Sequence, residues 1–574
     1  MSGIRWAVLA AGAIAALAGA SYASGWLVLQ FLGLDTRLLG LETYLGYLRA
    51  LDLPQVAPYG GRIRAAGWLG SAVPMLAYGG LVYLAVRPAR QSLHGEARFA
   101  SVHDVARRGL FRRDPAAIVI GRMGRRLVRL GGQQFAILAA PTRSGKGVGL
   151  VVPNLLEYGH SVVVLDIKQE NFALTSGWRA RMGHDVFMFN PFAEDRRSHR
   201  WNPLGYVSAD PAFRVSDLQG IATMLYPERG SEQAFWVGHA RNAFLAFALY
   251  LFENLDDQRA AGFPQEAQHV PTLGMVYRLS SGDGIDMAAH LRDLSQRPFL
   301  GAEARLAFAS LLSQAPETFA SILGTCREPL NAWVNPVLDA ATSANDFLLT
   351  DLRRRRTTIY VGVQPNRLAE ARTILNLFFS QLIHLNTKDL PSTDAALKYQ
   401  CLLLMDEFTA IGRIDIIASA VAYMAGYNLR LLPIIQSMAQ LDAVYGKEVA
   451  RTILTNHALQ ILFAPREQQD ADDYSEMLGY TTVRKDSRTR QRGWGRDGSI
   501  SESDERRALM LPQELKAMGQ TRQIFLYEGI PHPVRCDKIR YYQERRFRVR
   551  LLPPVQVPVL PTWGSSRKEA VDHT

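Results

Sequence analysis

The segment Ala140-Pro141-Thr142-Arg143-Ser144-Gly145-Lys146-Gly147 decides the fold of this chain. It follows an apolar stretch, 135–139, typical of a buried strand, and precedes an apolar run from Val148 that can start a helix. A loop in this context offers backbone N–H groups and a helix N-terminus to a phosphate, while the lysine reaches the β- and γ-phosphate oxygens. The sequence therefore predicts a phosphate-binding loop in which residues 140–148 contact a nucleotide and Lys146 is catalytic.

Two positions of the loop depart from the usual pattern G-x-x-x-x-G-K-[S/T]. Ala140 stands in place of the first glycine, and Gly147 stands in place of the hydroxyl residue that normally contacts Mg²⁺. Gly145 is retained, which lets the backbone approach the phosphate closely. Because the match is relaxed, the prediction needs support from other strand ends.

A second apolar strand, 401–405, ends in the acidic pair Asp406 and Glu407. On a strand parallel to the one that carries the loop, Asp406 would hold the Mg²⁺ shell, and Glu407 would polarise the attacking water. The alternative is an acidic strand end that only caps a helix. We predict the metal and catalytic roles.

Two further strands end in polar residues at the same predicted edge of the sheet. The strand 431–435 ends at Gln436, an amide that can sense the γ-phosphate or orient water, with a plain surface amide as the alternative. The strand 161–165 is followed by Asp166 and Lys168. This pair either contacts a nucleotide or a neighbouring subunit, or forms an ion pair with itself.

Short apolar runs alternate with helical stretches after Arg87, which predicts an α/β fold with a largely parallel sheet. Between about residues 206 and 345 the strand signal stops, which indicates a helical domain inserted into the sheet domain. There the aromatic residues of 235–255, Phe235 and Trp236 among them, are predicted to pack in a core. The predicted strands are 135–139, 161–165, 186–190, 358–363, 401–405, 431–435, 459–463 and 523–527.

Two N-terminal runs without charged residues, 6–34 and 65–86, are each long enough to span a bilayer. The second reaches about 33 Å at about 1.5 Å per residue. We predict an uncleaved two-helix anchor with residues 35–64 outside, because the phosphate-binding loop needs cytoplasmic ATP. The alternative is a signal peptide cleaved after Ser21-Tyr22-Ala23.

The composition excludes several protein classes. Of the 574 residues, 48% are hydrophobic and 21% charged, which argues against a disordered or coiled-coil chain. A net charge of +12 favours an anionic partner such as nucleic acid or lipid. The three cysteines lie far apart, so neither a disulfide framework nor a zinc site is predicted. The basic, Gly-containing stretch 484–507 is predicted to be a mobile loop with solvated charge, and the alternative is a pore loop that contacts nucleic acid.

Taken in order, these pieces resemble the TraG-like type IV secretion coupling proteins, the membrane-anchored ATPases of conjugation and effector export. The resemblance covers about residues 90–546 and includes Ala140 to Gly149, where that family also carries Gly after the lysine. It continues in motifs spread along the chain. These are Leu165-Asp166-Ile167-Lys168, Trp201-Asn202-Pro203-Leu204, Phe235-Trp236, Asp406-Glu407-Phe408, Gln436-Ser437, Gln440-Leu441, Asn456, Phe463-Ala464-Pro465, Leu511-Pro512 and Glu514.

The resemblance implies a RecA-like P-loop nucleotide-binding domain with an inserted all-α domain and an N-terminal two-helix transmembrane anchor. It also implies ATP and Mg²⁺ as cofactors, and homo-hexamers with ATP sites between subunits. The expected domains are a transmembrane anchor at 1–90, a nucleotide-binding domain at 91–205 and 346–546, the inserted helical domain at 206–345, and a Pro-rich extended tail at 547–574.

The function implied is that of a bacterial inner-membrane ATPase with a cytoplasmic soluble part, which delivers substrates to a type IV secretion channel. The cargo is either a relaxase-DNA complex or effector proteins, and direct contact with DNA stays open. One alternative is a receptor platform that binds ATP without turnover, and another is an FtsK-like DNA translocase. The run 353–356 supplies arginine-finger candidates, with a solvated charge run as the alternative.

Overall fold

The computed structural model describes residues 3–86, 93, 95–228, 230, 233–282, 286–488 and 500–561. The chain divides into two compact units, Met1–Leu93 and His94–Thr574. Two sequence predictions fall partly outside the described residues: the centre of the predicted loop, 489–499, and the end of the predicted tail, 562–574.

The N-terminal unit is a pair of long apolar helices. Helix α1 spans Gly3–Leu32 and helix α3 spans Gly60–Val86, with the short helix α2 at Thr43–Arg49 between them. The two long helices approach closely at Gly70, where a Cβ atom would lie 2.5 Å from the backbone nitrogen of Ser24. By length and composition, two helical stretches can cross a membrane, Val8–Leu32 and Ala57–Tyr83.

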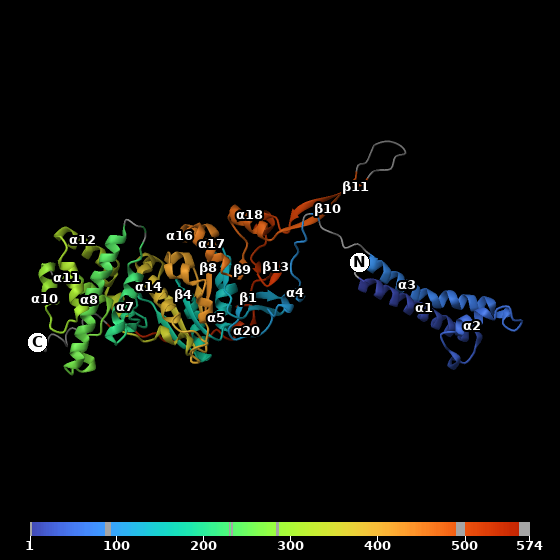
Figure 1. Cartoon of the computed structure of the whole chain (residues 1–574), viewed down its shortest axis with the longest axis horizontal. Coiled ribbons are helices and arrows are strands. Elements are labelled where there is room, and N and C mark those ends of the chain that lie inside the picture. Colours follow the sequence, from blue (N-terminus) through green and yellow to red (C-terminus); the bar gives the residue numbers. More distant parts are fainter. Residues whose placement is uncertain are drawn as a thin grey trace. The chain divides into compact units, whose positions relative to one another are not determined.

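The larger unit is built on an 11-stranded mixed sheet of order β2-β1-β13-β12-β9-β3-β8-β7-β4-β6-β5 (Figure 1). The strands from β9 to β5 in this order are parallel, and those from β2 to β12 pair antiparallel. The bounds are β1 Ile118–Met123, β2 Arg126–Leu130, β3 Ala136–Ala139, β4 Ser161–Asp166, β5 Asp185–Phe189, β6 Thr357–Gly362, β7 Cys401–Met405, β8 Leu429–Ile435, β9 Leu459–Leu462, β12 Arg522–Tyr527 and β13 Ile530–Asp537.

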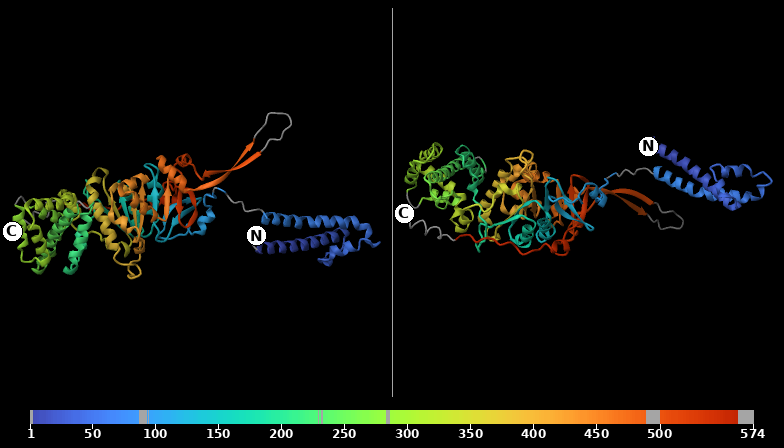
Figure 2. Two further views of the ribbon diagram at one scale, coloured as in Figure 1. Left: turned by 45° about the horizontal axis from the view of Figure 1, so that its top comes forward. Right: turned by 90° about the horizontal axis from the view of Figure 1, so that it is seen from below.

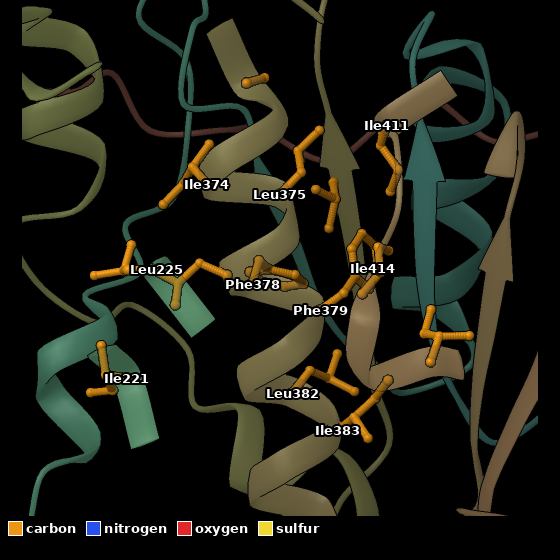
Figure 3. Packing of buried hydrophobic residues seen from close by; sticks show 14 of the residues in the cluster. Ile221, Leu225, Ile374, Leu375, Phe378, Phe379, Leu382, Ile383, Ile411 and Ile414 are labelled. Carbon is orange, nitrogen blue, oxygen red and sulfur yellow. The ribbon is translucent and has the colours of Figure 1, made fainter. Parts of the chain in front are cut away.

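Alternate residues of the parallel strands pack on opposite faces of the sheet. On β7, Leu402 and Leu404 join the core that includes Leu155 of α5 (Val152–Glu157), whereas Leu403 and Met405 join the core that includes α14 (Leu368–Asn386). Figure 3 shows the side chains of α14 between the sheet and helix α7 (Pro211–Leu225). Because both faces are covered, these strands are mainly apolar, with buried exceptions such as Arg430 of β8, and this pattern located them in the sequence.

A group of helices lies between β5 and β6 in the sequence and gathers at one end of the sheet unit (Figure 2). In α8, Phe244 and Phe247 are fully buried, as predicted. The prediction was wrong for Phe235 and Trp236, which are 54% and 37% exposed. Both precede Val237, where the buried stripe of this helix starts. The helices are α7, α8 Ala234–Ala260, α9 Leu273–Ser281, α10 Met287–Ser295, α11 Ala302–Leu312, α12 Pro316–Arg327 and α13 Pro336–Ala341.

The predicted mobile loop 484–507 is wrong for its described residues. These belong to the antiparallel strands β10 (Tyr480–Arg488) and β11 (Ile500–Ala508), which form a separate two-stranded sheet. Antiparallel pairing satisfies the backbone groups without requiring an apolar strand, so a charged sequence can still form a ladder. The remaining helices of the unit are α4 Val102–Arg107, α6 Glu170–Arg181, α15 Asp415–Ala420, α16 Met438–Tyr445, α17 Lys447–Thr455, α18 Gln468–Met477, α19 Pro512–Lys516 and α20 Arg545–Arg548.

The Pro-rich segment that follows α20 lies along α6. The N–H of Val555 donates to Ser176 Oγ at 3.2 Å, and a Cβ atom on Gly177 would lie 2.0 Å from the carbonyl oxygen of Pro553. Leu560 is buried in the core of the sheet unit. The segment up to residue 561 is therefore extended but packed against the domain.

Candidate nucleotide-binding site

The loop 140–147 connects β3 to a helical segment that starts at Gly147 and continues as α5. Gly145 has a φ of +86°, a conformation that favours glycine, and Arg143 has a φ of +61°. Among the described residues, no hydrogen bond uses the backbone N–H of Arg143 or Gly145. The N–H of Ala140 instead donates to the carbonyl of Ile435 and extends the β3–β8 pairing. The backbone N–H groups of Arg143 and Gly145 are therefore available to an anion.

The four residues predicted to be catalytic or to bind the metal lie together at the carboxyl ends of three neighbouring strands. Lys146 forms an ion pair with Glu407, and its Nζ lies 3.2 Å from Asp406 Oδ1. Gln436 Nε2 donates to Glu407 Oε2 at 2.8 Å. Strand β8 lies between β3 and β7, so Gln436 is placed between the lysine loop and the acidic pair. Thr142 Oγ1 closes the cluster by donating to Gln436 Oε1 at 2.9 Å.

Glu407 has an uncommon backbone conformation, with a φ of +59°. Although it directly precedes a short helical turn, Phe408–Ile411, its side chain makes no capping hydrogen bond there. The carboxylate is directed to Lys146 and Gln436 instead. The geometry thus disfavours the helix-capping alternative, and the left-handed backbone holds the carboxylate at the site.

The two acids differ in their electrostatic environment. Burial raises the pKa of Asp406 above its usual value despite the nearby charge of Lys146. Burial also acts to raise the pKa of Glu407, but hydrogen bonds from Lys146 and Gln436 outweigh it and lower that pKa. Glu407 is therefore ionised at neutral pH, as a residue that orients or deprotonates water must be.

The residues present fit a bound Mg²⁺ ion. Asp406 Oδ1 is buried, and Lys146 Nζ lies 3.2 Å from it, so this carboxylate oxygen would become available to Mg²⁺ when Lys146 moves to the phosphates of a nucleotide. No cluster of three or more His, Cys, Asp or Glu suited to a metal occurs in the described part of the chain. Mg²⁺ usually takes one or two carboxylates and completes its shell with phosphate oxygens and water. Asp406 alone satisfies that requirement.

Asp166 and Lys168 do not pair with each other in the described structure. Asp166 is buried at the start of α6, where it accepts from Phe172 N at 2.8 Å and Asn171 Nδ2 at 3.1 Å. Burial raises the pKa of Asp166 to about 6. Its carboxylate thus holds the helix start beside the site.

The run Arg353 to Arg356 precedes β6 and so lies at the opposite edge of the sheet from Lys146. Arg353 is buried and donates to Asn386 Oδ1 and to the carbonyls of Asp389 and Tyr427. Arg354 pairs with Asp394. These contacts give Arg353 and Arg354 a structural role within their own subunit.

Lys538, which no motif in the sequence indicated, contacts the phosphate-binding loop. It follows β13, and its Nζ donates to the carbonyl of Ser144 at 3.1 Å and lies 3.5 Å from the centre of the Phe463 ring. Burial lowers the pKa of Lys538 to about 8. β13 contains Pro531 and Pro533 and shows no apolar run, so no strand signal in the sequence points to it.

A cavity of about 170 Å³ adjoins the loop between Thr142, Gln436 and helix α18. Asp470 of α18 lines this cavity and is 4% exposed. Burial and the neighbouring charge of Glu467 raise the pKa of Asp470 to about 6. At neutral pH the Asp470 carboxylate is therefore ionised although it is buried, and this charge lowers the stability of the folded chain.

We expect Asp470→Asn to increase the free energy of unfolding by about 1 kcal/mol at pH 8. Above pH 6 the folded wild type carries the buried charge, whereas below about pH 4 the side chain is neutral in both the folded and the unfolded chain. The gain should therefore shrink as the pH falls from 6 to 4. Thermal unfolding at pH 8 and pH 5 measures it, with the exposed Asp473→Asn as control. An equal gain at both pH values would contradict the raised pKa.

Comparisons with known proteins give a consistent result. The family model described as type IV secretory system conjugative DNA transfer matches residues 90–560. Protein VirD4 of Rhizobium rhizogenes is 32% identical over 424 residues, which cover 73% of this chain and 60% of that protein. Conjugal transfer protein TraG of Escherichia coli is 27% identical over 473 residues, covering 76% and 72% of the two chains. The chain thus spans 60% of the length of that VirD4 protein.

Among solved structures, the plasmid coupling protein TrwB in complex with ADP and Mg²⁺ matches with a TM-score of 0.55 and 17% identity. The match covers 79% of this chain and 95% of that one. The likeness shows the fold and confirms the predicted class: a RecA-like α/β domain with an inserted helical domain, preceded here by two apolar helices.

Proposed function

The chain belongs to the type IV secretory system conjugative DNA transfer family, as its motifs predicted, and we propose that it is an inner-membrane coupling ATPase. In this role it recruits protein or protein-DNA substrates and delivers them to a type IV secretion channel. The observation that carries the proposal is the convergence of Lys146, Asp406, Glu407 and Gln436 at the ends of three adjacent parallel strands. ATP and Mg²⁺ are its expected ligands, as ADP and Mg²⁺ are in the TrwB complex.

The proposed chemistry assigns each side chain one task. The loop N–H groups and Lys146 bind the β- and γ-phosphates, and Asp406 supplies a carboxylate to Mg²⁺, which would neutralise phosphate charge. Glu407 orients the attacking water and accepts its proton, and Gln436 holds the Glu407 carboxylate in place through its amide. Because Lys146 is paired with Glu407, it must move to the phosphates before Glu407 can act on water.

We propose that α1 and α3 anchor the protein in the bacterial inner membrane as a multi-pass hairpin, with the sheet unit in the cytoplasm where ATP is available. Both helices have the length and composition of membrane spans. We further propose a homo-hexamer that contacts channel components, DNA, and either a relaxase-DNA complex or effector proteins. The family membership supports these partners.

The inserted helices α7–α13 are the proposed place of cargo recognition. The phosphate chemistry resides entirely on the sheet, and recognition is commonly carried by segments added to a rigid scaffold. The exposed aromatic residues Phe235 and Trp236 on α8 give this region an apolar contact surface.

Grafting residues 206–345 from a relative with different cargo should switch which cargo is bound and exported, while ATP binding is retained. The measurement is a pull-down with both cargoes, together with export by a strain that lacks the native gene. A chimera that exchanges only residues 480–508, which include β10 and β11, serves as control and should keep the original preference. If a folded 206–345 chimera kept the original cargo, this region would not be the place of cargo recognition.

A further inference from the structure

A second, strongly basic cavity lies away from the nucleotide site. It has a volume of about 520 Å³ and is lined by four arginines, Arg113, Arg129, Arg546 and Arg550, with the acids Asp114 and Glu157. These residues come from the segment after α4, from β2, from α20 and its continuation, and from the end of α5. Figure 1 shows α4, β1, α5 and α20 at the end of the sheet unit opposite α10 to α12.

The cavity has more positive charge than its own acids neutralise. Glu157 is shared by two arginines, with Arg129 Nη2 at 3.2 Å and Arg550 Nη1 at 2.7 Å from its carboxylate oxygens. Asp114 Oδ1 is already used by the N–H of Ala116 at 2.9 Å. The lining therefore carries four guanidinium groups against two carboxylates.

Two of the arginines are fixed and two are available. Arg550 also donates to the carbonyl of Leu156 at 2.7 Å and lies over the Trp178 ring, and Arg129 is only 11% exposed. Arg113 is exposed and forms no ion pair with any described residue. Arg546 is 40% exposed, and its Nε lies 3.5 Å from Glu544. Arg113 and Arg546 can therefore turn toward a ligand.

The cavity is separate from the ATP site. Residues Gly147–Glu157 form the helical segment that begins beside Lys146 and ends at the cavity. Eleven residues at about 1.5 Å each separate the two by about 16 Å, too far for one phosphate to reach both. A ligand in the cavity would contact the far end of the same helix that starts at the phosphate-binding loop.

We propose that this arginine cavity binds a phosphate group. A planar guanidinium matches phosphate oxygens in a bidentate manner, and a partly enclosed set of four arginines suits a phosphate better than a single carboxylate. The phosphate can belong to an anionic phospholipid or to a soluble ligand. Only residues 87–93 separate α3 from this unit in the sequence, which makes a lipid headgroup a source to be tested. The inference does not depend on the proposed ATPase function.

The test uses the full chain in neutral detergent with Lys146→Ala, so that the phosphate-binding loop contributes little. Two probes are titrated calorimetrically: dioctanoylphosphatidylglycerol and inorganic pyrophosphate. The double variant Arg113→Gln/Arg546→Gln should weaken binding of at least one probe about tenfold or more, because charge-assisted hydrogen bonds are lost. The matched control is Arg107→Gln/Arg108→Gln, two exposed arginines at the end of α4, which should change affinity by about twofold at most.

Loss of lipid binding alone supports a phospholipid headgroup, and loss of pyrophosphate binding or of both supports phosphate recognition from solution. The proposal would be overturned if the Arg113→Gln/Arg546→Gln variant bound both probes as tightly as the Lys146→Ala protein with its four arginines intact. It would also be overturned if neither probe bound. An unchanged thermal midpoint shows that the double variant is folded, which is expected because both side chains are exposed.

Discussion

Replacing Lys146 by Ala is expected to lower ATP turnover by about a hundredfold or more and to abolish substrate export. The change removes the lysine charge that we propose binds the β- and γ-phosphates. It also leaves Asp406 and Glu407 side by side without the cation that now lies against both. Membrane insertion should be normal, because α1 and α3 belong to a separate unit. Phosphate release by purified protein and export by a complemented strain measure the effect.

The matched control is Lys398→Ala. Lys398 is exposed and lies just before β7, at the amino end of the strand that carries Asp406 and Glu407 at its other end. This variant should hydrolyse ATP and export cargo like the wild type. Normal export by Lys146→Ala would refute the ATPase assignment.

Glu407→Gln should keep ATP binding and lower turnover by about a hundredfold to ten-thousandfold. The amide has nearly the shape of the carboxylate and can still accept the hydrogen bond from Gln436, but it is a poor base. Because the ion pair between Lys146 and Glu407 competes with the phosphates, its loss should leave ATP affinity equal to or greater than that of the wild type.

Fluorescent ATP titration and single-turnover hydrolysis separate these two effects. Glu448→Gln, an exposed residue on α17, is the control and should alter neither. If Glu407→Gln hydrolysed ATP at the parental rate, the water-activating residue would have to be sought elsewhere.

The parallel part of the fold was predictable because its strands are buried on both faces. All eight predicted strands occur in the structure, and β7 has the predicted bounds, 401–405. Strands β1, β2 and β13 were missed because their sequences interrupt the apolar pattern, as Arg122, Arg129 and Pro533 illustrate. Antiparallel strands near the rim of a sheet tolerate such residues, so no continuous apolar run marks them.

The candidate site was predictable in its residues but not in its contacts. Each of Lys146, Asp406, Glu407 and Gln436 follows an apolar strand, and the shared edge of a parallel sheet brings such ends together. That β8 lies between β3 and β7 is a matter of strand order, which no local pattern encodes. Lys538 reaches the loop from 394 residues away in the sequence, and no motif near it indicates this contact.

The motor and the receptor platform share the fold and the ATP-binding loop, and they differ only in turnover. Lys146 and Gln436 both contact Glu407, and their hydrogen bonds lower its pKa and keep it ionised, as the proposed hydrolysis requires. A platform needs the phosphate-binding loop but has no use for a base held at this position. The motor is therefore the function that the site geometry favours.

The most direct test of the ATPase claim is the steady-state rate of phosphate release by full-length wild-type protein in vesicles. DNA and cargo are added in turn, and the Glu407→Gln variant is measured in parallel. We expect the wild type to turn over ATP at about 1 to 100 per second in at least one of these conditions, with the variant near background. A wild-type protein that binds ATP but releases no phosphate in any of them would contradict the claim and leave the receptor platform.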